Sequence, residues 1–294
     1  MGTPTHSPSS RALDRELAAL AAGEYPARLG LRPERVEEGR AAVAMPFDPS
    51  IVNRGGRVHG GALASLLLAA ARIAVAASER AETERRVRLL TANVSFLAVP
   101  RHGRLVGEAS VVRRGREIAH TSVNAFDEDG TTVANAAIAV GVVDPAAAEE
   151  VVVAHGRNAR PRDLAQGTRV PGSPYLSAAG VLVLPPEQRS ARALLPQARN
   201  RAMDPPRVDE GAIAGLADSC AAYAAHLREP GFGQRGGVTV SMALAFHSSR
   251  EEDLIGIGAV TGHAAGCYVA GVDVTGAASG ASVASGFAVY RLPA

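Results

Sequence analysis

The stretch "VNRGGRVHGGALASLLLAAA", residues 52–71, carries the signal that decides the fold. A loop rich in glycine and arginine, with Asn53 and His59, runs directly into a long apolar segment. Ala and Leu are strong helix formers, so we expect a buried helix from about Gly61 to Arg80. The amides at the start of this helix would be free to bind a ligand, but the helix carries no acid near that end.

The composition indicates a globular protein. Of the 294 residues, 47% are hydrophobic and 4% aromatic, so the core must consist mainly of Ala, Val and Leu. All 31 basic residues are arginines, against 29 acidic ones, and no basic stripe is interleaved with aromatics. We therefore expect no nucleic acid as a partner. Cys220 and Cys267 form neither a disulfide framework nor a zinc motif, so we expect no metal.

The first 22 residues predict a tail followed by an amphipathic helix from about Ser10 to Ala22. Charged residues interrupt its apolar side, which is not typical of a signal peptide. No segment has the length and polarity expected of a membrane span. We therefore expect a cytoplasmic protein without a membrane partner.

The sequence repeats itself with an offset of 150 residues. The matching pairs include Tyr25 and Tyr175, Gly30 and Gly180, Pro46 and Pro196, Phe96 and Phe246, and Gly130 and Gly280. Matches of tyrosine, phenylalanine and proline at one constant offset are unexpected by chance. The pattern therefore predicts two tandem repeats.

Each half predicts one long helix followed by a run of strands. Alternating β-branched segments occupy residues 89–143, with a hairpin turn at Asp129 and Gly130. In the second half, the helix is expected from about Gly211 to Leu227, and strands follow to residue 292. A helix wrapped by an antiparallel meander is an α+β layout. Pairing the two halves would cover the open edge of each sheet and give a pseudo-dimer.

These patterns divide the chain into four parts. We predict an N-terminal tail and short helix over 1–22, a first repeat over 23–143, a linker over 144–172 and a second repeat over 173–294. The linker is the stretch that is rich in proline and arginine.

The sequence resembles the PaaI-like hotdog-fold acyl-CoA thioesterases. The resemblance rests on Asn53, His59, Gly60 and Gly61 with their spacing, ahead of a helix and a β-meander. It covers about residues 25–143 and, more weakly, 175–292, so the whole chain resembles the tandem, double-hotdog members. It implies two hotdog repeats, each an antiparallel sheet around one central helix, and hydrolysis of an acyl-CoA or acyl-carrier thioester. It implies no cofactor except coenzyme A as part of the substrate, and a homodimer of double-hotdog chains.

The sequence departs from the family at the catalytic acid. In the family, a carboxylate lies on the central helix nine residues after the histidine, and here that position is Leu68. The same position in the second half, 150 residues later, is Asp218. An acid nine residues along its helix is about 13 Å from its own helix start, so a neighbouring helix must supply the amides. The resemblance therefore implies one site, with the loop from half one and the acid from half two.

The complementary site should be inactive. The counterparts of Asn53 and His59 in the second half are Met203 and Asp209. Asp209 and Glu210 open the second helix, where acidic side chains typically cap free amides. A site built from these residues and Leu68 would lack the catalytic groups.

The resemblance implies a role for each residue of the intact site. Asp218 would be the nucleophile or the general base, unless it lies on a solvated helix face. Gly60 would point its N–H at the thioester carbonyl, and Gly61 would adjoin the substrate and start the helix, unless both are only turn glycines. Asn53 would orient water or the thioester oxygen, or serve as a turn residue. His59 would donate to the carbonyl or hold Asn53, or only cap the helix.

Other residues are weaker candidates. Thr239 would assist the acid from the following strand, where half one has Leu89, or it is an ordinary strand threonine. Arg113, Arg114 and Arg116 would bind the phosphates of coenzyme A, or form a solvated basic turn. The alternative function is a catalytically silent protein that binds acyl thioesters.

Overall fold

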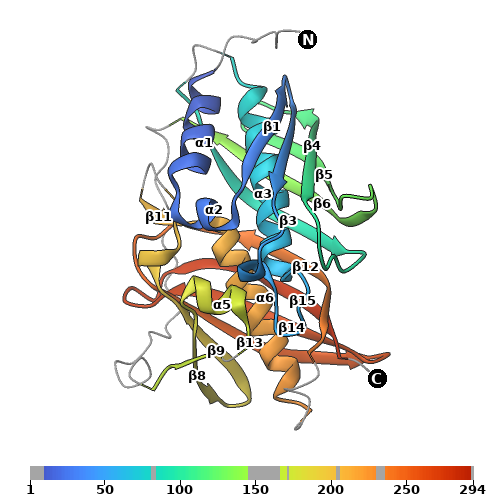
Figure 1. Ribbon diagram of the computed structural model, residues 1–294. Helices are drawn as coiled ribbons and strands as arrows, with labels where there is room; N and C mark the ends of the chain where they lie inside the picture. Colours follow the sequence, from blue (N-terminus) through green and yellow to red (C-terminus); the bar gives the residue numbers. More distant parts are fainter. Residues whose placement is uncertain are drawn as a thin grey trace.

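The computed structural model describes residues 10–80, 84–144, 166–170, 172–202, 206–229 and 236–292. Two long central helices pack against each other, one in the upper and one in the lower half of the view, and strands wrap around each of them (Figure 1). These helices are α3 (Gly60–Ala77) and α6 (Glu210–His226). The shorter helices are α1 (Arg11–Ala22), α2 (Glu24–Leu29) and α5 (Pro174–Ala179), with 3-10 turns η1 (Pro49–Ile51) and η3 (Gln197–Arg199).

Within the described residues, one antiparallel sheet of 13 strands runs through both halves in the order β1-β2-β4-β5-β6-β3-β12-β15-β14-β13-β9-β8-β7. The strands of the first half are β1 (Arg32–Glu37), β2 (Arg40–Met45), β3 (Arg86–Phe96), β4 (Leu105–Arg114), β5 (Ile118–Phe126) and β6 (Thr132–Val143). Those of the second half are β7 (Thr168–Arg169), β8 (Leu182–Glu187), β9 (Ser190–Leu195), β12 (Val238–Phe246), β13 (Leu254–Ala264), β14 (Cys267–Gly276) and β15 (Ser282–Arg291). β10 (Arg201–Ala202) and β11 (Arg207–Val208) form a separate pair.

The two halves join edge to edge where β3 pairs with β12. Val94 lies opposite Met242 and Ala92 opposite Leu244 in this antiparallel pair. Each strand therefore covers an edge that would otherwise expose unpaired backbone groups. The predicted pairing of the two sheet edges agrees with this arrangement.

The predicted layout of a helix and an antiparallel meander is confirmed. Both central helices begin and end within a few residues of the predicted bounds, and Gly130 forms the expected turn with a φ of +79°. The sequence patterns missed α2 and α5, because six residues are too few to show a helical period. The predicted linker lies largely outside the described residues, as does Met203.

Small residues let α3 and α6 approach closely. A β-carbon on Gly61 would overlap the backbone of Gly215, and one on Gly211 would lie 2.6 Å from Oγ of Ser65. These residues lie four apart on each helix, so they share one face. The close crossing brings each helix N-terminus beside the middle of the other helix.

A buried tyrosine pair lies next to this crossing. The hydroxyls of Tyr25 and Tyr175, which match at the 150-residue offset, share a hydrogen bond of 2.6 Å. Tyr25 also shares one of 2.8 Å with Ser65. Burial raises the pKa of Tyr25 to about 12 and raises that of Tyr175 as well, so both hydroxyls keep their protons at neutral pH. The pair ties α2 of one half to α5 of the other.

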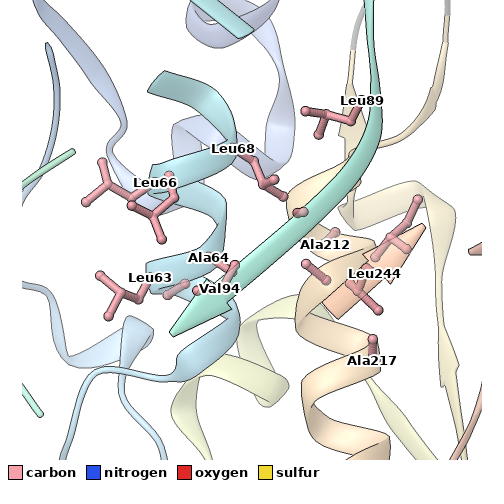
Figure 2. Packing of buried hydrophobic residues seen from close by; sticks show 14 of the residues in the cluster. Leu63, Ala64, Leu66, Leu68, Leu89, Val94, Ala212, Ala217 and Leu244 are labelled. Carbon is pink, nitrogen blue, oxygen red and sulfur yellow. The ribbon is translucent and has the colours of Figure 1, made fainter. Parts of the chain in front are cut away.

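The core between the helices and the sheet consists mainly of Ala, Val and Leu, as the composition predicts. Figure 2 shows Leu66 and Leu68 of α3 and Ala217 of α6, with Leu244 of β12 nearby. The expectation that no segment is long and apolar enough to span a membrane is wrong by length and composition, because α3 passes that test among the described helices. Of that window, 83% is buried inside the protein. Cys220 is also buried, and burial raises the pKa of its thiol to about 12.

Candidate active site

The carboxylate of Asp218 on α6 lies against the first residue of α3. A β-carbon on Gly60 would lie 2.8 Å from Oδ2 of Asp218 and 3.3 Å from Oδ1. The two residues meet because α6 crosses α3 at Gly215, three residues before the acid. Asp218 is only 4% exposed, so it does not lie on a solvated helix face. The structure thus brings the acid of the second half to the helix start of the first.

The backbone N–H of Gly60 is available to a ligand. Within the described part of the chain it has no hydrogen-bond acceptor, whereas the N–H of Gly61 donates to Nδ1 of His59 at 3.0 Å. A free amide at a helix N-terminus attracts negative charge, and exclusion of water strengthens that attraction. Because glycine has no β-carbon, a ligand oxygen can approach this amide beside the carboxylate.

Replacing Gly60 with alanine should therefore lower kcat for the reaction of this site by about 100-fold. The new β-carbon would overlap the buried carboxylate of Asp218, which must then shift, and this overlap should also cost about 1 kcal/mol of folding stability. Steady-state kinetics and thermal unfolding measure the two effects separately. Gly262→Ala is the matched control, because a β-carbon there meets only Val269 at 3.9 Å. An unchanged kcat in Gly60→Ala would contradict this assignment.

Thr239 on β12 orients the acid. Its hydroxyl donates a short hydrogen bond to Oδ1 of Asp218, which leaves Oδ2 on the side of Gly60. A charge-assisted hydrogen bond of this kind fixes the rotamer of a carboxylate. Thr239 is thus in the position that the resemblance implies, and Leu89 stands at the equivalent place of the other half.

His59 caps α3 and lies beside the acid. Its Nδ1 accepts from the N–H of Gly61 and is 3.3 Å from Oδ2 of Asp218. Burial lowers the pKa of His59, with Asp218 opposing that effect, so the ring is neutral at neutral pH. Because Nδ1 is an acceptor, the neutral ring carries its proton on Nε2. Tyr175 stacks on the ring with the centroids 4.2 Å apart and fixes its orientation.

Asn53 shapes the loop in front of α3. Its Oδ1 accepts from the N–H groups of Gly55 at 2.8 Å and Arg57 at 3.3 Å, and its carbonyl accepts from Gly56 at 3.0 Å. These are the contacts of a turn residue. The side chain also borders the cavities described next, so the structural and the functional interpretation are compatible.

Two adjoining cavities meet at this place. They share the lining residues Asn53, His59, Ala222, Gly237 and Tyr290. The first cavity contains Gly60, Asp218 and Thr239, together with apolar side chains such as Leu63 and Phe96. The second cavity continues along α6 toward Tyr223 and His226. A substrate can therefore extend to both sides of the carboxylate.

The structure does not bring the three arginines to these cavities. Arg113 and Arg116 are exposed, and Arg114 pairs with Glu79 just beyond the C-terminal end of α3. A helix of 18 residues is about 27 Å long, so this turn lies at the opposite end of α3 from Gly60. The basic turn is thus placed away from the candidate site.

The equivalent place in the other half is filled by an ion-pair network. Arg72 on α3 binds Glu16 of α1 at 2.8 Å and Glu210 of α6 at 2.7 Å, and Arg207 lies 3.4 Å from Glu210. The position equivalent to Arg72 in the second half is Ala222, which leaves the active cavity open. Arg72 and α1 thus occupy the space that a substrate would need.

This place is the complementary site expected from the sequence, which we call the mirror site, and it contains the expected residues apart from Met203, which lies outside the described residues. Leu68, Leu89, Asp209 and Glu210 line one small cavity with Arg72. Asp209 caps α6 by accepting from the N–H of Gly211 at 2.8 Å, which confirms the predicted capping role. Leu68 takes the place of the acid. The mirror site therefore holds a helix cap and an ion pair, whereas the site of Asp218 holds a carboxylate and the free N–H of Gly60.

The charge of Asp209 should make folding stability depend on pH. Burial and the neighbouring Glu210 raise the pKa of Asp209 to about 6. Because this pKa is higher in the folded than in the unfolded state, protonated Asp209 contributes fully to folding stability below about pH 4. That contribution is lost as the pH rises through about 6. Asp209→Asn keeps a good helix cap, so it should stabilise the protein by about 1–2 kcal/mol above pH 7 and have little effect below pH 4. Urea unfolding at both pH values measures this, and equal effects at both would contradict it.

Comparison with known proteins finds sequence similarity in the first half of the chain. Residues 48–142 match the family model described as the acyl-CoA thioesterase N-terminal domain. A protein of Halobacterium salinarum, whose name assigns it provisionally to the esterases, is 33% identical over 93 residues. The match covers 31% of this chain and 61% of that protein, so the chain spans about three fifths of the length of this curated relative.

Solved structures extend the comparison to the whole fold. A hot dog fold protein of unknown function from Alicyclobacillus acidocaldarius has a TM-score of 0.66 at 20% identity, over 90% of this chain and 96% of that one. An acyl-CoA thioesterase II from Mycobacterium marinum has a TM-score of 0.56 at 13% identity, over 90% and 97%. At these identities the likeness concerns the fold. The chain therefore has the hotdog fold, and its residues 48–142 are similar to the N-terminal domain of the acyl-CoA thioesterases.

Proposed function

We propose that the chain hydrolyses an acyl-CoA, or an acyl-carrier thioester, to a free acid and a thiol at one site shared by its two halves. The observation that carries this proposal is the buried carboxylate of Asp218 beside the free N–H of Gly60. A base, an amide donor and an adjoining cavity are the parts that acyl transfer to water requires. The thioesterase-family domain of the first half supports the same reaction class.

In the general-base route, the thioester carbonyl oxygen accepts from the N–H of Gly60. Asp218 takes a proton from a water molecule, whose oxygen attacks the carbonyl carbon. The N–H of Gly60 and the dipole of α3 stabilise the negative charge that develops on the oxygen. Collapse of the intermediate breaks the carbon–sulfur bond, and the thiolate leaves with the proton held by Asp218.

In the nucleophilic route, Oδ2 of Asp218 attacks the carbonyl carbon and forms a mixed anhydride, with release of the thiolate. Water then hydrolyses the anhydride and restores the carboxylate, so the products are the same. When water attacks the Asp218 carbonyl of the anhydride, a single turnover in heavy-oxygen water places the label in Asp218, which the general-base route cannot do. In both routes Thr239 fixes the carboxylate, and the neutral ring of His59 borders the cavity beside it.

We infer that residues 23–143 and 173–294 are two hotdog repeats of a duplicated, PaaI-like unit. Equivalent residues make equivalent contacts in the two halves, which supports this. Gly30 ends α2 and Gly180 ends α5 in the left-handed conformation, with φ of 65° and 71°. A β-carbon on Gly30 would lie 2.8 Å from Pro46, and one on Gly180 would lie 3.1 Å from Pro196. A cytoplasmic location and a pairing of two such chains stay predictions.

The proposal is tested by incubating the purified full chain with acyl-CoAs that differ in chain length, branching and aromaticity. Release of free thiol at more than the spontaneous rate is the expected result for at least one of them. Binding of acyl-CoAs without turnover would overturn the proposal and favour a silent acyl-thioester-binding protein.

A further inference from the structure

The second cavity has a polar end that the proposed reaction does not use. It runs along α6 from the shared residues beside Asp218. Its border combines apolar groups such as Val170 and Leu176 with the polar residues Arg54, Ser173 and Ser219. Tyr223 and His226 lie three residues apart on α6, so both face it from one side of the helix. They follow Asp218 by five and eight residues, which corresponds to about 7 and 12 Å along the helix axis.

Two buried polar atoms at this end have no partner. Among the described residues, the hydroxyl of Tyr223 and Nδ1 of His226 make no hydrogen bond. The other ring nitrogen of His226 is 3.5 Å from the hydroxyl of Tyr290, and the two rings meet edge to face with centroids 5.6 Å apart. Buried polar groups are nearly always paired in proteins, so unpaired atoms beside a cavity indicate a ligand group that completes them.

The protonation of these side chains limits the ligand chemistry. Burial raises the pKa of Tyr223 and lowers that of His226. At neutral pH the cavity therefore offers an uncharged hydroxyl and an uncharged ring nitrogen. Such a pair suits a neutral oxygen that accepts from Tyr223, and a ligand hydroxyl can also donate to His226. An unsubstituted hydrocarbon chain would leave both atoms buried and unpaired.

We propose that Tyr223 and His226 bind a hydroxyl or carbonyl oxygen of the acyl group, so that the preferred substrates are thioesters of hydroxy- or oxo-substituted acids. This inference rests on the proposed function. The pantetheine arm of coenzyme A also carries hydroxyl and amide groups. Both cavities reach water, the first at Val99, which is 41% exposed, and the second at the exposed Arg54 and Gly55. In this inference the acyl group occupies the second cavity and the arm occupies the first, and the truncated esters described below test that assignment.

The test compares hexanoyl-CoA with ω-hydroxyhexanoyl-CoA, which differ in one hydroxyl. The wild-type chain should show at least a tenfold higher kcat/KM for the hydroxylated ester, because a site built to bind an oxygen rejects the analogue without it. Tyr223→Phe should bring the ratio close to one, because it lowers kcat/KM for the hydroxylated ester and removes the unpaired hydroxyl that disfavours hexanoyl-CoA. Tyr268→Phe is the matched control, because that hydroxyl donates to Glu229 and lines neither cavity.

A second arm separates the two sources of the oxygen. The same acyl groups are supplied on N-acetylcysteamine, which lacks most of the pantetheine arm, and the preference for the hydroxylated ester should persist. If Tyr223→Phe instead lowers kcat/KM equally for both CoA esters and for neither truncated ester, Tyr223 serves the pantetheine arm and the inference is overturned. A wild-type ratio near one overturns it as well.

A binding measurement separates this inference from the proposed function. Calorimetric titration of Asp218→Asn with the two CoA esters reports the preference without turnover. Tighter binding of the hydroxylated ester, lost when Tyr223→Phe is added, supports the polar end even if no thioester is hydrolysed. Equal affinities for the two esters count against the polar end even if the wild-type chain hydrolyses both.

Discussion

Replacement of Asp218 by asparagine is expected to lower kcat for acyl-CoA hydrolysis by about 10³-fold, with the fold and the substrate affinity preserved. Asparagine has the same shape and can still accept from Thr239, but it can neither take a proton from water nor attack a carbonyl carbon. The change therefore removes the reacting group without altering the cavity. Release of thiol measures kcat, and calorimetry with the same acyl-CoA measures affinity.

Asp209→Asn is the matched control for this experiment. It makes the same chemical change at the start of α6, on the mirror side where Leu68 replaces the acid. We expect its kcat to stay within about twofold of the wild type, because a residue outside the reacting groups contributes little to the barrier. Comparable losses in both variants, or full activity in Asp218→Asn, would exclude the single shared site.

The second large effect concerns stability. Arg72→Met is expected to reduce the free energy of unfolding by about 3 kcal/mol, because it leaves the carboxylates of Glu16 and Glu210 buried without their shared cation. Arg72 is itself only 8% exposed, so water cannot replace it. Arg207 still lies near Glu210, which keeps the loss at the lower end of the usual range for broken buried pairs. Urea unfolding measures the change, and kcat per folded molecule should not change.

Two further variants make this prediction specific. Arg35→Met removes an exposed arginine that pairs with Glu37 and Glu108, and should cost less than about 1 kcal/mol. Glu16→Gln alone and combined with Arg72→Met completes a double-mutant cycle, in which the combined loss should be smaller than the sum. Additive losses would show that Arg72 acts by packing alone and not through its ion pair with α1.

Much of the arrangement was predictable from the sequence, because it depends on local patterns and one constant offset. The apolar run after His59 and its counterpart before Leu227 predict the central helices, and alternating segments predict the meander. The 150-residue offset places Asp218 where Leu68 stands in the first half. The structure then brings Asp218, Gly60 and Thr239 together, while their catalytic roles stay predictions until the variants are measured.

The rest depends on contacts between distant segments, which local patterns do not record. Tyr175 was visible as a repeat match, but its stacking on His59 follows from the placement of α5 against the other half. Tyr223 stands in an apolar helix that gives no sign of a cavity beside it. The basic turn at Arg114 has the composition of a phosphate site, and only the length of α3 shows that it lies far from Gly60. Arg72 likewise becomes meaningful only beside Glu16.

The seam between β3 and β12 has a consequence for how the molecule can change. Asp218 and Gly60 of the candidate site belong to one polypeptide, so dilution cannot separate them, and the specific activity of the proposed reaction should not depend on protein concentration. In a symmetric pair of identical chains every substitution would appear twice, in both sites at once. Covalent linkage removes that restriction, which leaves one half free to replace the groups of the candidate site with an anchored helix while the other half keeps them.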